Sequence, residues 1–429
     1  MLDINYIREN TEEVKKKLAT KNFDVKIIDQ VLDLDEKRRE LITKTEELRA
    51  LRNIAAENKD ITKGREVKEK LQKLEPDLKE IEEKYKEVFW QIPNIPSDDT
   101  PIGKDESGSK VIRKWGTIKK FGFKIKDHLE LGVSLNIIDT EKAAKVSGAR
   151  FNYLKGDSVL LQNALYQFAL SILTDEKKLK EIADKVRKGY TPKAFLPIIP
   201  PFIVKAEVMK KMARYDPTDD RYFFEKDDVM FIGSAEHSLG PLHMDETLNE
   251  KDLPLRYFAF TPAFRREAGT YGKDTKGIMR QHQFEKIEME SFTTHENGED
   301  EQNFFVAIQE YMMQALEIPY QVVAICTGDM GTPDYRQIDI EAWIPSEEKY
   351  RETHTSDYMT DYQARRLNTK VRLGDKTEFV HMNDATFSST NRPIIAILEN
   401  YQNEDGSVTI PKVLQKWMGK EVISKLVAS

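Results

Sequence analysis

Two stretches within the first hundred residues carry apolar side chains at helical spacing. In the second stretch the steps alternate between four and three residues, through Val67, Leu71, Leu74, Leu78, Ile81, Tyr85 and Val88. Such alternation is a heptad seam. The first stretch, roughly residues 27–56, has related spacing through Val31, Leu34, Leu41, Leu48 and Ala55. The pattern predicts two helices that pack together, each spanning roughly 45 Å at about 1.5 Å per residue.

The segment between these helices, ENKDITKGRE (57–66), is polar and contains Gly64, which suits a tight reversal. We therefore expect an antiparallel two-helix coiled coil over about residues 27–92. A helical hairpin packed on the protein core is the alternative, and the heavy charge on the remaining faces favours a free arm. Closely spaced prolines in FWQIPNIPSDDTPIG (89–103) should end the second helix.

From about Asp127 the pattern changes to short apolar or alternating runs that resemble strands. These runs are LGVSLNII (131–138), AFLPIIPPFIV (194–204), YFAFTPAF (257–264), YQVVAIC (320–326) and IDIEAWI (338–344). Amphipathic helical segments such as 159–176 separate them, and GTYGKDTKG (269–277) joins two candidate strands. Strict strand–helix–strand alternation is rare, which favours an α+β domain with a mostly antiparallel sheet over a doubly wound parallel one.

These patterns divide the chain into an N-terminal domain (1–100), a linker (101–126) and a larger domain (127–429). The linker carries a basic cluster at 110–126, for which a solvated face with aromatic anchors is a better interpretation than a strip facing phosphates.

Composition narrows the class of protein. The net charge of −7 argues against a globally basic nucleic-acid coat, although a local basic strip could still bind RNA. The single cysteine, Cys326, leaves neither a disulfide framework nor a cysteine-based zinc site, and zinc is not expected. The first residues lack a secretory signal pattern, and no apolar run has membrane-spanning length. We therefore expect a cytoplasmic protein without membrane attachment.

Candidate chemistry lies in residues 264–290, because Walker-type and dinucleotide-binding glycine motifs are both absent. If 278–290 is a strand, Phe284, Glu288 and Glu290 share one face with Arg280 and His282. A guanidinium, an aromatic plane and carboxylates suit a triphosphate, a purine and an ammonium respectively. An exposed charged hairpin explains the same spacing, and the charge pattern alone leaves both interpretations open.

The stretch FRREAGTYGKDTKGIMRQHQFEKIEM (264–289) resembles motif 2 of the class II aminoacyl-tRNA synthetases, in the form that seryl-tRNA synthetases use. GYTPKAFLPIIPPFIV (189–204) resembles motif 1, with Pro201 near the dimer interface, and RPIIAILENYQ (392–402) resembles motif 3. The opening MLDINYIRENTEEV also resembles that family. The resemblance implies a class II catalytic domain, and a homodimeric enzyme that activates L-serine with ATP and transfers it to tRNA(Ser), with tRNA(Sec) as a further acceptor.

Roles follow from this resemblance residue by residue. Arg265 would hold the α-phosphate and the substrate carboxylate, Glu267 would contact the adenine side, and Phe284 would stack on the base. Arg392 would clamp the γ-phosphate. The whole ATP-binding set implied is Arg265, Arg266, Glu267, Phe284, Glu352, Thr353, His354, Thr355 and Arg392, with Arg265 and Arg392 catalytic and with Glu352 and Thr355 as Mg²⁺ ligands.

The serine-binding set implied by the resemblance is Ser234, Ala235, Glu236, Arg265, Glu288, Asp384 and Thr386. Glu288 would balance the ammonium and engage the side-chain hydroxyl. A pocket built to bind a hydroxyl rejects alanine, because its own polar groups would otherwise stay unpaired.

Departures from the family pattern gather at this pocket. The family usually has Thr-Ser-Glu or Thr-Ala-Glu at 234–236, Ser-Asn-Cys at 357–359, Asn-Gly-Ser or Asn-Gly-Thr at 384–386, and glycine at 391; this chain has Ser234-Ala235-Glu236, Asp357-Tyr358-Met359, Asp384-Ala385-Thr386 and Asn391. Asp384 matters most, because an ionised aspartate only accepts hydrogen bonds and adds charge near Glu288. Neutral drift in a serine enzyme is one hypothesis. The other is a relative that activates another small polar amino acid or charges a non-tRNA acceptor.

In the family the arm reaches the long variable arm of serine tRNA across a homodimer. The basic residues near the distal half of the expected arm are Arg49, Arg52, Lys59, Lys63, Arg65 and Lys68. For each of them a solvated coiled-coil surface is the competing interpretation. A non-catalytic tRNA-binding paralogue is an alternative for the whole protein, and the joint presence of the ATP-site residues argues against it.

Overall fold

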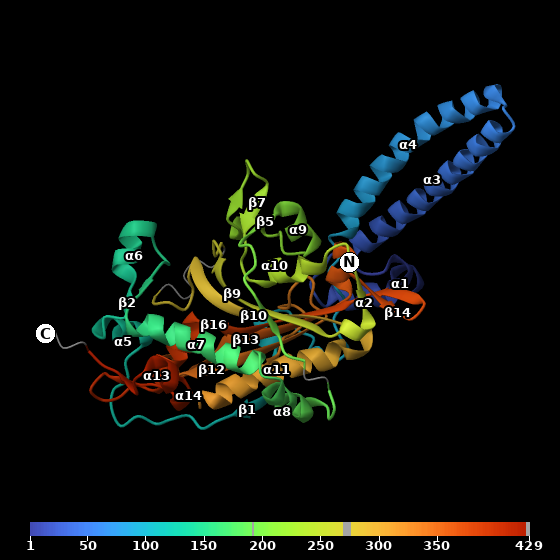
Figure 1. The fold of residues 1–429 in the computed structure, drawn as a ribbon. Helices are drawn as coiled ribbons and strands as arrows, with labels where there is room; N and C mark the ends of the chain where they lie inside the picture. The colour runs from blue at the N-terminus through green and yellow to red at the C-terminus, as the bar shows by residue number, and fades with distance from the viewer. Residues whose placement is uncertain (191–192, 269–275, 426–429) are drawn as a thin grey trace. The chain divides into compact units, whose positions relative to one another are not determined.

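The computed structural model describes residues 1–190, 193–268 and 276–425, and the chain forms two compact units, Met1–Pro96 and Ser97–Ser429 (Figure 1). The first unit is helical, and the second is built on a large sheet with flanking helices. In the first unit the helices are α1 (Ile4–Glu9), α2 (Thr11–Ala19), α3 (Lys26–Glu57) and α4 (Ile61–Phe89).

The two long helices α3 and α4 form an antiparallel hairpin (Figure 1). Arg38 pairs with Glu82 at 3.7 Å and Arg49 pairs with Glu75 at 2.9 Å, so the residue numbers run in opposite directions along the two helices. Every residue of the predicted seam is buried or half-buried, most fully Val31, Ala55, Val67 and Leu71. The structure therefore confirms the two predicted helices and the face along which they meet.

The structure confirms a reversal within the predicted segment 57–66, but Gly64 does not form it. The second helix begins at Ile61 because the Asp60 carboxylate accepts a hydrogen bond from the Lys63 backbone N–H at 3.0 Å, which caps the helix. Gly64 consequently lies in the first turn of α4, and the chain reverses at 58–60, where Lys59 has a φ of +53°.

The second unit contains an eight-stranded sheet in the order β1-β11-β12-β13-β16-β10-β9-β4. Neighbouring strands are antiparallel except for the pair β4–β9. This confirms the predicted α+β class and its mostly antiparallel sheet. The strands are β1 (Lys110–Trp115), β4 (Leu196–Ile198), β9 (Leu255–Phe264), β10 (Gln283–Thr293), β11 (Tyr320–Ala324), β12 (Arg336–Ile344), β13 (Lys349–Thr360) and β16 (His381–Ser389).

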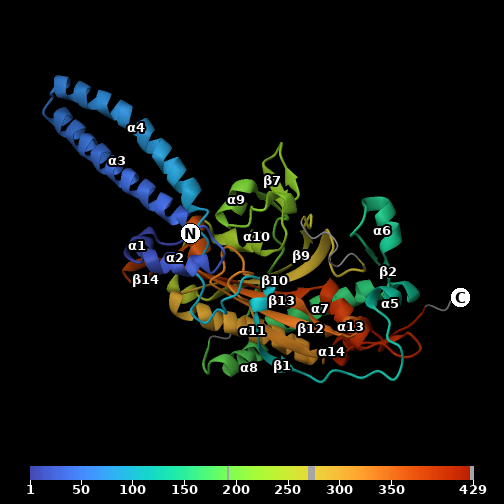
Figure 2. The same cartoon turned by 180° about the vertical axis from the view of Figure 1, so that it is seen from behind.

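The two faces of the sheet have different roles around the middle of β10. Ile287 and Met289 belong to the main apolar core, together with side chains of α11 (Gly298–Ala315), which packs across β10, β12, β13 and β16. Because side chains alternate along a strand, Glu288 and Glu290 lie on the opposite face. Figures 1 and 2 both show α11 beside α8 (Glu176–Val186). One face is thus covered by helices, and the other carries polar groups.

Shorter elements complete the second unit. The remaining helices are α5 (His128–Ser134), α6 (Thr140–Ser147), α7 (Asp157–Leu173), α9 (Ala206–Lys211), α10 (Glu236–Leu239), α12 (Tyr362–Leu367), α13 (Asn391–Asn400) and α14 (Lys412–Met418). The remaining strands are β2 (Ile138–Asp139), β3 (Tyr153–Leu154), β5 (Ile203–Lys205), β6 (Phe223–Phe224), β7 (Val229–Phe231), β8 (Thr247–Asn249), β14 (Lys370–Leu373), β15 (Lys376–Phe379), β17 (Val408–Thr409) and β18 (Val422–Ile423).

Two further expectations need correction. LGVSLNII (131–138) begins inside helix α5, because Asp127 and Glu130 form a capping box that starts a helix there. The expected linker 101–126 contains β1, which pairs with β11 at the edge of the main sheet. Most of the predicted connection GTYGKDTKG, residues 269–275, lies outside the described residues.

Candidate active site

A polar cavity opens above the face of the sheet opposite α11. It measures about 110 Å³ and adjoins a larger cavity of about 560 Å³, with which it shares Met279, Arg280, Glu352 and Arg392. Strands β10, β13 and β16, the end of β9 and the start of α13 supply its walls. The lining residues are Arg265, Glu267, Met279, Arg280, Gln281, Phe284, Lys286, Glu352, Thr353, Thr355, Thr386, Ser389, Asn391 and Arg392.

One wall combines a guanidinium with an aromatic plane. Arg265 directly follows β9, and its Nε donates to the Gly233 carbonyl at 2.9 Å, which fixes the side chain. Its guanidinium carbon lies 5.5 Å from the centre of the Phe284 ring. Glu267 pairs with Arg280, Oε2 to Nη1, at 2.5 Å. The wall therefore offers an anion-binding fork beside a surface on which a base can stack.

A bulge in β13 places Glu352 and Thr355 together on the opposite wall of the cavity. Glu352 and Thr355 are three residues apart, so a regular strand would point them to opposite faces. The register between β12 and β13 shifts at Ile340/Glu341, which inserts Thr353 as an extra residue and turns both side chains to the cavity.

The first turn of α13 adds a second guanidinium to this wall. Arg392 Nη1 lies 2.7 Å from Glu352 Oε1. Desolvation of Glu352 would raise the pKa of its carboxyl, but the guanidinium groups of Arg392 and Arg265 outweigh it, and the pKa lies below its usual value. Glu352 therefore stays ionised and available to a cation.

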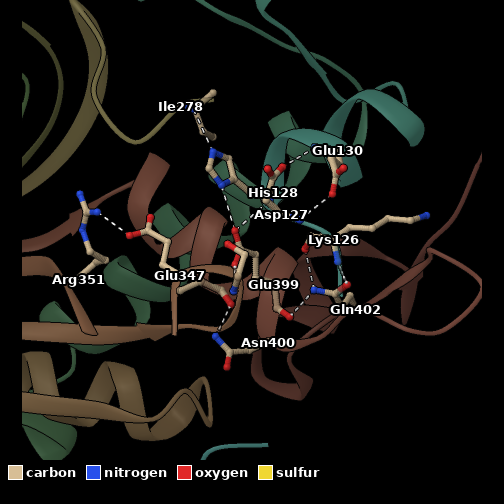
Figure 3. Close-up of polar contacts among 12 residues, drawn as sticks. Lys126, Asp127, His128, Glu130, Ile278, Glu347, Arg351, Glu399, Asn400 and Gln402 are labelled. Carbon is tan, nitrogen blue, oxygen red and sulfur yellow. Dashed lines mark hydrogen bonds and ion pairs between the residues drawn. The ribbon is translucent and has the colours of Figure 1, made fainter. Parts of the chain in front are cut away.

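A buried histidine anchors the segment that leads into β10 (Figure 3). The His128 Nδ1 lies 3.1 Å from Glu399 Oε1, and the opposite ring nitrogen accepts from the Ile278 backbone N–H at 3.3 Å. Gly277 has a φ of +72°, and a side chain there would collide with the His128 ring. These contacts join α5, α13 and the approach to β10. The predicted strand 278–290 actually begins at Gln283, so Arg280 and His282 precede it.

A smaller group of polar side chains lies next to the cavity, where the serine-binding set is expected. Ser234 Oγ donates to Glu288 Oε2 at 3.2 Å, and the Lys286 ammonium lies 2.5 Å from that same oxygen. Burial raises the pKa of Glu288 to about 7, with Lys286 acting against the rise and Glu236 adding to it. Desolvation opposes ionisation of Glu236, but Lys286, His237 and Arg214 hold its pKa below the usual value.

Asp384 has a counter-charge that the sequence did not suggest. The guanidinium of Arg214 lies 3.6 Å from Asp384, 3.7 Å from Asp334 and 3.8 Å from Asp357. Asp357, Asp384 and Glu290 stand directly opposite one another on β13, β16 and β10. Burial, reinforced by the neighbouring carboxylates, raises the pKa of all three well above the usual range. The aspartate is therefore part of a buried charge cluster.

Of the residues predicted to bind ATP, Arg266 and His354 lie away from the cavity. The Arg266 guanidinium lies over the Tyr222 ring at 5.8 Å, and the His354 ring lies against the Met312 sulfur in the core. Thr353 lines the cavity, although its hydroxyl donates to the Ile340 carbonyl.

Ala235 is buried in an apolar cluster together with Met359. The phenol of Tyr358 lies 2.6 Å from His381 Nδ1, so of the altered triplet 357–359 only Asp357 joins the charge cluster.

Alternation along β10 could have revealed Lys286, which lies between Phe284 and Glu288 on the same face. Arg214 gives no such signal, because it is remote in sequence from every strand residue that it contacts. The six basic residues proposed for the arm are all exposed in the first unit, and Arg49 is engaged with Glu75.

Comparison with known proteins identifies the family. Residues 1–96 match the model of the seryl-tRNA synthetase N-terminal domain, and residues 222–401 match that of the tRNA synthetase class II core domain (G, H, P, S and T). The serine–tRNA ligase of Pseudothermotoga lettingae is 38% identical over 441 residues, covering 99% of this chain and 100% of that protein. The chain belongs to the seryl-tRNA synthetase family.

Solved structures of seryl-tRNA synthetases agree with this membership. The enzyme of Pyrococcus horikoshii, complexed with ATP, superimposes with a TM-score of 0.89 at 37% identity, and both chains are covered completely. The cytoplasmic enzyme of Naegleria fowleri, in complex with AMP, gives a TM-score of 0.86 at 30% identity, covering 100% of this chain and 99% of that one. Within the described residues, no helix of this seryl-tRNA synthetase family member is long and apolar enough to cross a membrane.

Proposed function

We propose that this chain is a serine–tRNA ligase, which activates L-serine with ATP to seryl-adenylate and transfers the serine to tRNA(Ser). The observation that carries the proposal is one continuous site. The guanidinium groups of Arg265 and Arg392 and the Phe284 ring line a cavity. This cavity adjoins the buried Ser234–Glu288 pair through Lys286. The first part suits a nucleotide, and the second suits a small amino acid with an ammonium and a hydroxyl.

Adenylate formation needs positioning and charge stabilisation more than covalent help. The serine carboxylate attacks the α-phosphorus in line, a new P–O bond forms, and the bond to pyrophosphate breaks. We assign Arg265 to the α-phosphate and Arg392 to the γ-phosphate, with Phe284 against the adenine and Glu267 beside it. Guanidinium groups that are already fixed spread the growing negative charge without having to reorganise.

The donor set beside Arg392 fits Mg²⁺. Glu352 offers an ionised carboxylate and Thr355 a hydroxyl, both on the cavity wall, and such oxygen ligands together with phosphates and water are what this ion prefers. When bound, the ion would neutralise charge on the phosphates. Among the described residues no cluster of three His, Cys, Asp or Glu side chains suits a metal held by the protein alone, so the nucleotide would complete the coordination.

Exchange of pyrophosphate into ATP tests the proposal. Purified chain, ATP and labelled pyrophosphate would be incubated with each of the twenty amino acids in turn. We expect serine to support exchange far above the rest. Exchange with another small polar amino acid instead would favour the divergent-paralogue alternative, and no exchange with any amino acid would favour the non-catalytic tRNA-binding alternative.

We further propose that the protein functions as a homodimer. Support comes from the segment resembling motif 1, where Leu196, Ile199 and Ile203 are 59%, 88% and 49% exposed in the single chain. Burial of such side chains against a second copy would remove apolar surface from water. Light scattering should give twice the 49.8 kDa mass of one chain.

A further inference from the structure

The amino-acid pocket contains a positive charge of its own. Lys286 is only 6% exposed and is the one buried lysine in the described part of the chain. Its ammonium contacts Glu288 Oε2 at 2.5 Å and Ser234 Oγ at 2.9 Å. Nearby Glu236 is held ionised partly by this same ammonium. The lysine therefore contacts the group that the proposed function assigns to the ammonium of serine.

Lys286 does not satisfy all the carboxylate oxygens around it. Glu288 Oε1 and Glu236 Oε2 are buried and have no hydrogen-bond partner among the described residues. An unpaired carboxylate oxygen away from water is costly, so these two atoms point to a ligand that donates hydrogen bonds. A free amino acid supplies an ammonium with three donors and, in serine, a hydroxyl with a fourth.

Lys286 also faces the nucleotide side. Its side chain lines the cavity that holds Arg265, Glu352 and Arg392, so one residue borders both substrate positions. A lysine ammonium is a compact charge on a flexible stem, and rotation of that stem moves the charge by several ångströms. Two ammonium groups at Glu288 would repel each other, whereas the phosphates of ATP offer the displaced ammonium a new partner.

We propose that Lys286 couples the two substrates, pairing with Glu288 in the free enzyme and turning to the α-phosphate of ATP when serine takes its place. This inference rests on the proposed function. ATP then tightens serine binding, because it draws away the ammonium that competes for Glu288. By thermodynamic reciprocity serine tightens ATP binding by the same factor.

Calorimetry with an uncleavable nucleotide tests this coupling. The affinity of serine would be measured with and without saturating α,β-methylene-ATP, in the wild type and in Lys286→Met. We expect the analogue to tighten serine binding by about tenfold in the wild type. In Lys286→Met the ratio should fall to about one, because the competing ammonium is gone. The ratio compares the serine affinity of one variant with and without the analogue, so a mutation that weakens serine binding equally under both conditions does not change it.

Two further variants keep the result interpretable. Lys286→Gln, which retains hydrogen bonding to Glu288 and Ser234, replaces the methionine variant if that chain does not fold. Lys155→Met removes a lysine that pairs with Asp139 at 3.0 Å outside the pocket, and it should keep the wild-type ratio. A tenfold ratio that survives in the folded Lys286 variants, or a wild-type ratio near one, would overturn the coupling role. If the wild type binds no serine under either condition, the proposed function fails together with it.

Discussion

At the scale of single residues, Arg214 explains how an aspartate can replace the family's usual asparagine at position 384. The guanidinium contacts the carboxyls of Asp334, Asp357 and Asp384 together, and the raised pKa of Asp357 and Asp384 favours their protonated forms, so the cluster carries less negative charge than ionised carboxylates would. This supports neutral change over altered selectivity, because Asp384 is accommodated by Arg214 and the neighbouring carboxyls and its raised pKa disfavours an added charge in the pocket. The cluster should matter more for folding than for the choice of amino acid.

Replacing the central cation tests this view. Arg214→Met leaves three buried carboxyls without their shared counter-charge, and we expect a loss of unfolding free energy on the order of 3 kcal/mol. Urea unfolding followed by circular dichroism measures it. Asp384→Asn in the same background should recover part of the loss, since one carboxyl is removed. No recovery in the double variant would contradict a shared cluster.

A pH profile tests the role of Glu288. Its carboxyl is protonated below the pKa of about 7 that burial produces, and only the ionised form can pair with an ammonium. Since Lys286, Ser234 and Glu236 surround it, the relevant state is that of the whole group. We expect kcat/KM for serine in the exchange reaction to rise from about pH 6 to about pH 8. Glu288→Gln should lower the activity and flatten that rise; an unchanged profile would exclude this carboxyl as its source.

At the scale of elements, helix α11 holds the strands of the site through two buried amides. Gln309 Nε2 donates to the carbonyls of Thr355 and Thr386, and Gln302 Nε2 donates to those of Arg336 and Ser356. The apolar face of the helix thus also forms hydrogen bonds to the backbone of β12, β13 and β16. The two glutamines donate these hydrogen bonds from the face of the sheet that α11 covers. Their acceptors are backbone carbonyls of the strands whose other face carries the site.

Gln309→Leu should remove the ties next to Thr355 and Thr386 while nearly preserving side-chain volume. We expect the unfolding free energy to fall by about 1–3 kcal/mol, because two buried carbonyls lose a donor. Denaturant titration measures it. Gln314→Leu, on the same helix but bonded to the Tyr320 hydroxyl, is the matched control and should cost less. Equal losses of unfolding free energy in Gln309→Leu and Gln314→Leu would mean that the two hydrogen bonds from Gln309 do not add stability beyond that of an ordinary glutamine on this helix.

Sequence patterns could predict the elements whose signal is local. The heptad seam, the run 257–264 and the alternation through Phe284 and Glu288 are patterns that depend only on residues close together in the sequence. Each corresponds to a helix or strand in the structure. Residues 131–134 have a strand-like composition, but they are helical in the structure because the capping box at Asp127 starts helix α5. Arg214 and the bulge at Thr353 depend on contacts between distant segments, and no local pattern encodes them.

At the scale of the whole molecule, the division into two units predicts separable functions. We expect the hairpin of α3 and α4 to serve tRNA alone, through exposed basic residues of its distal half. The amino-acid and nucleotide positions both lie in the second unit. Activation of serine should therefore not need the hairpin.

Replacing residues 39–81 by about five glycine and serine residues tests that separation. The cut keeps the Arg38–Glu82 pair, which can close the shortened helices. We expect pyrophosphate exchange within about twofold of the wild type, and charging of tRNA(Ser) reduced by at least about a hundredfold, because many phosphate contacts are lost together. An aminoacylation assay measures the second quantity. Undiminished charging would remove the hairpin from tRNA recognition.

The division of labour between the two faces of β10 has a practical consequence for engineering. Positions 284, 286, 288 and 290 can be randomised together in a mutant library without changing a single side chain of the core that Ile287 and Met289 help to build. Selection from such a library would sample new substrate preferences, with stability measured in parallel because Lys286, Glu288 and Glu290 are buried charged groups. Randomising positions 287 and 289, whose side chains are fully buried in that core, should mostly return insoluble clones.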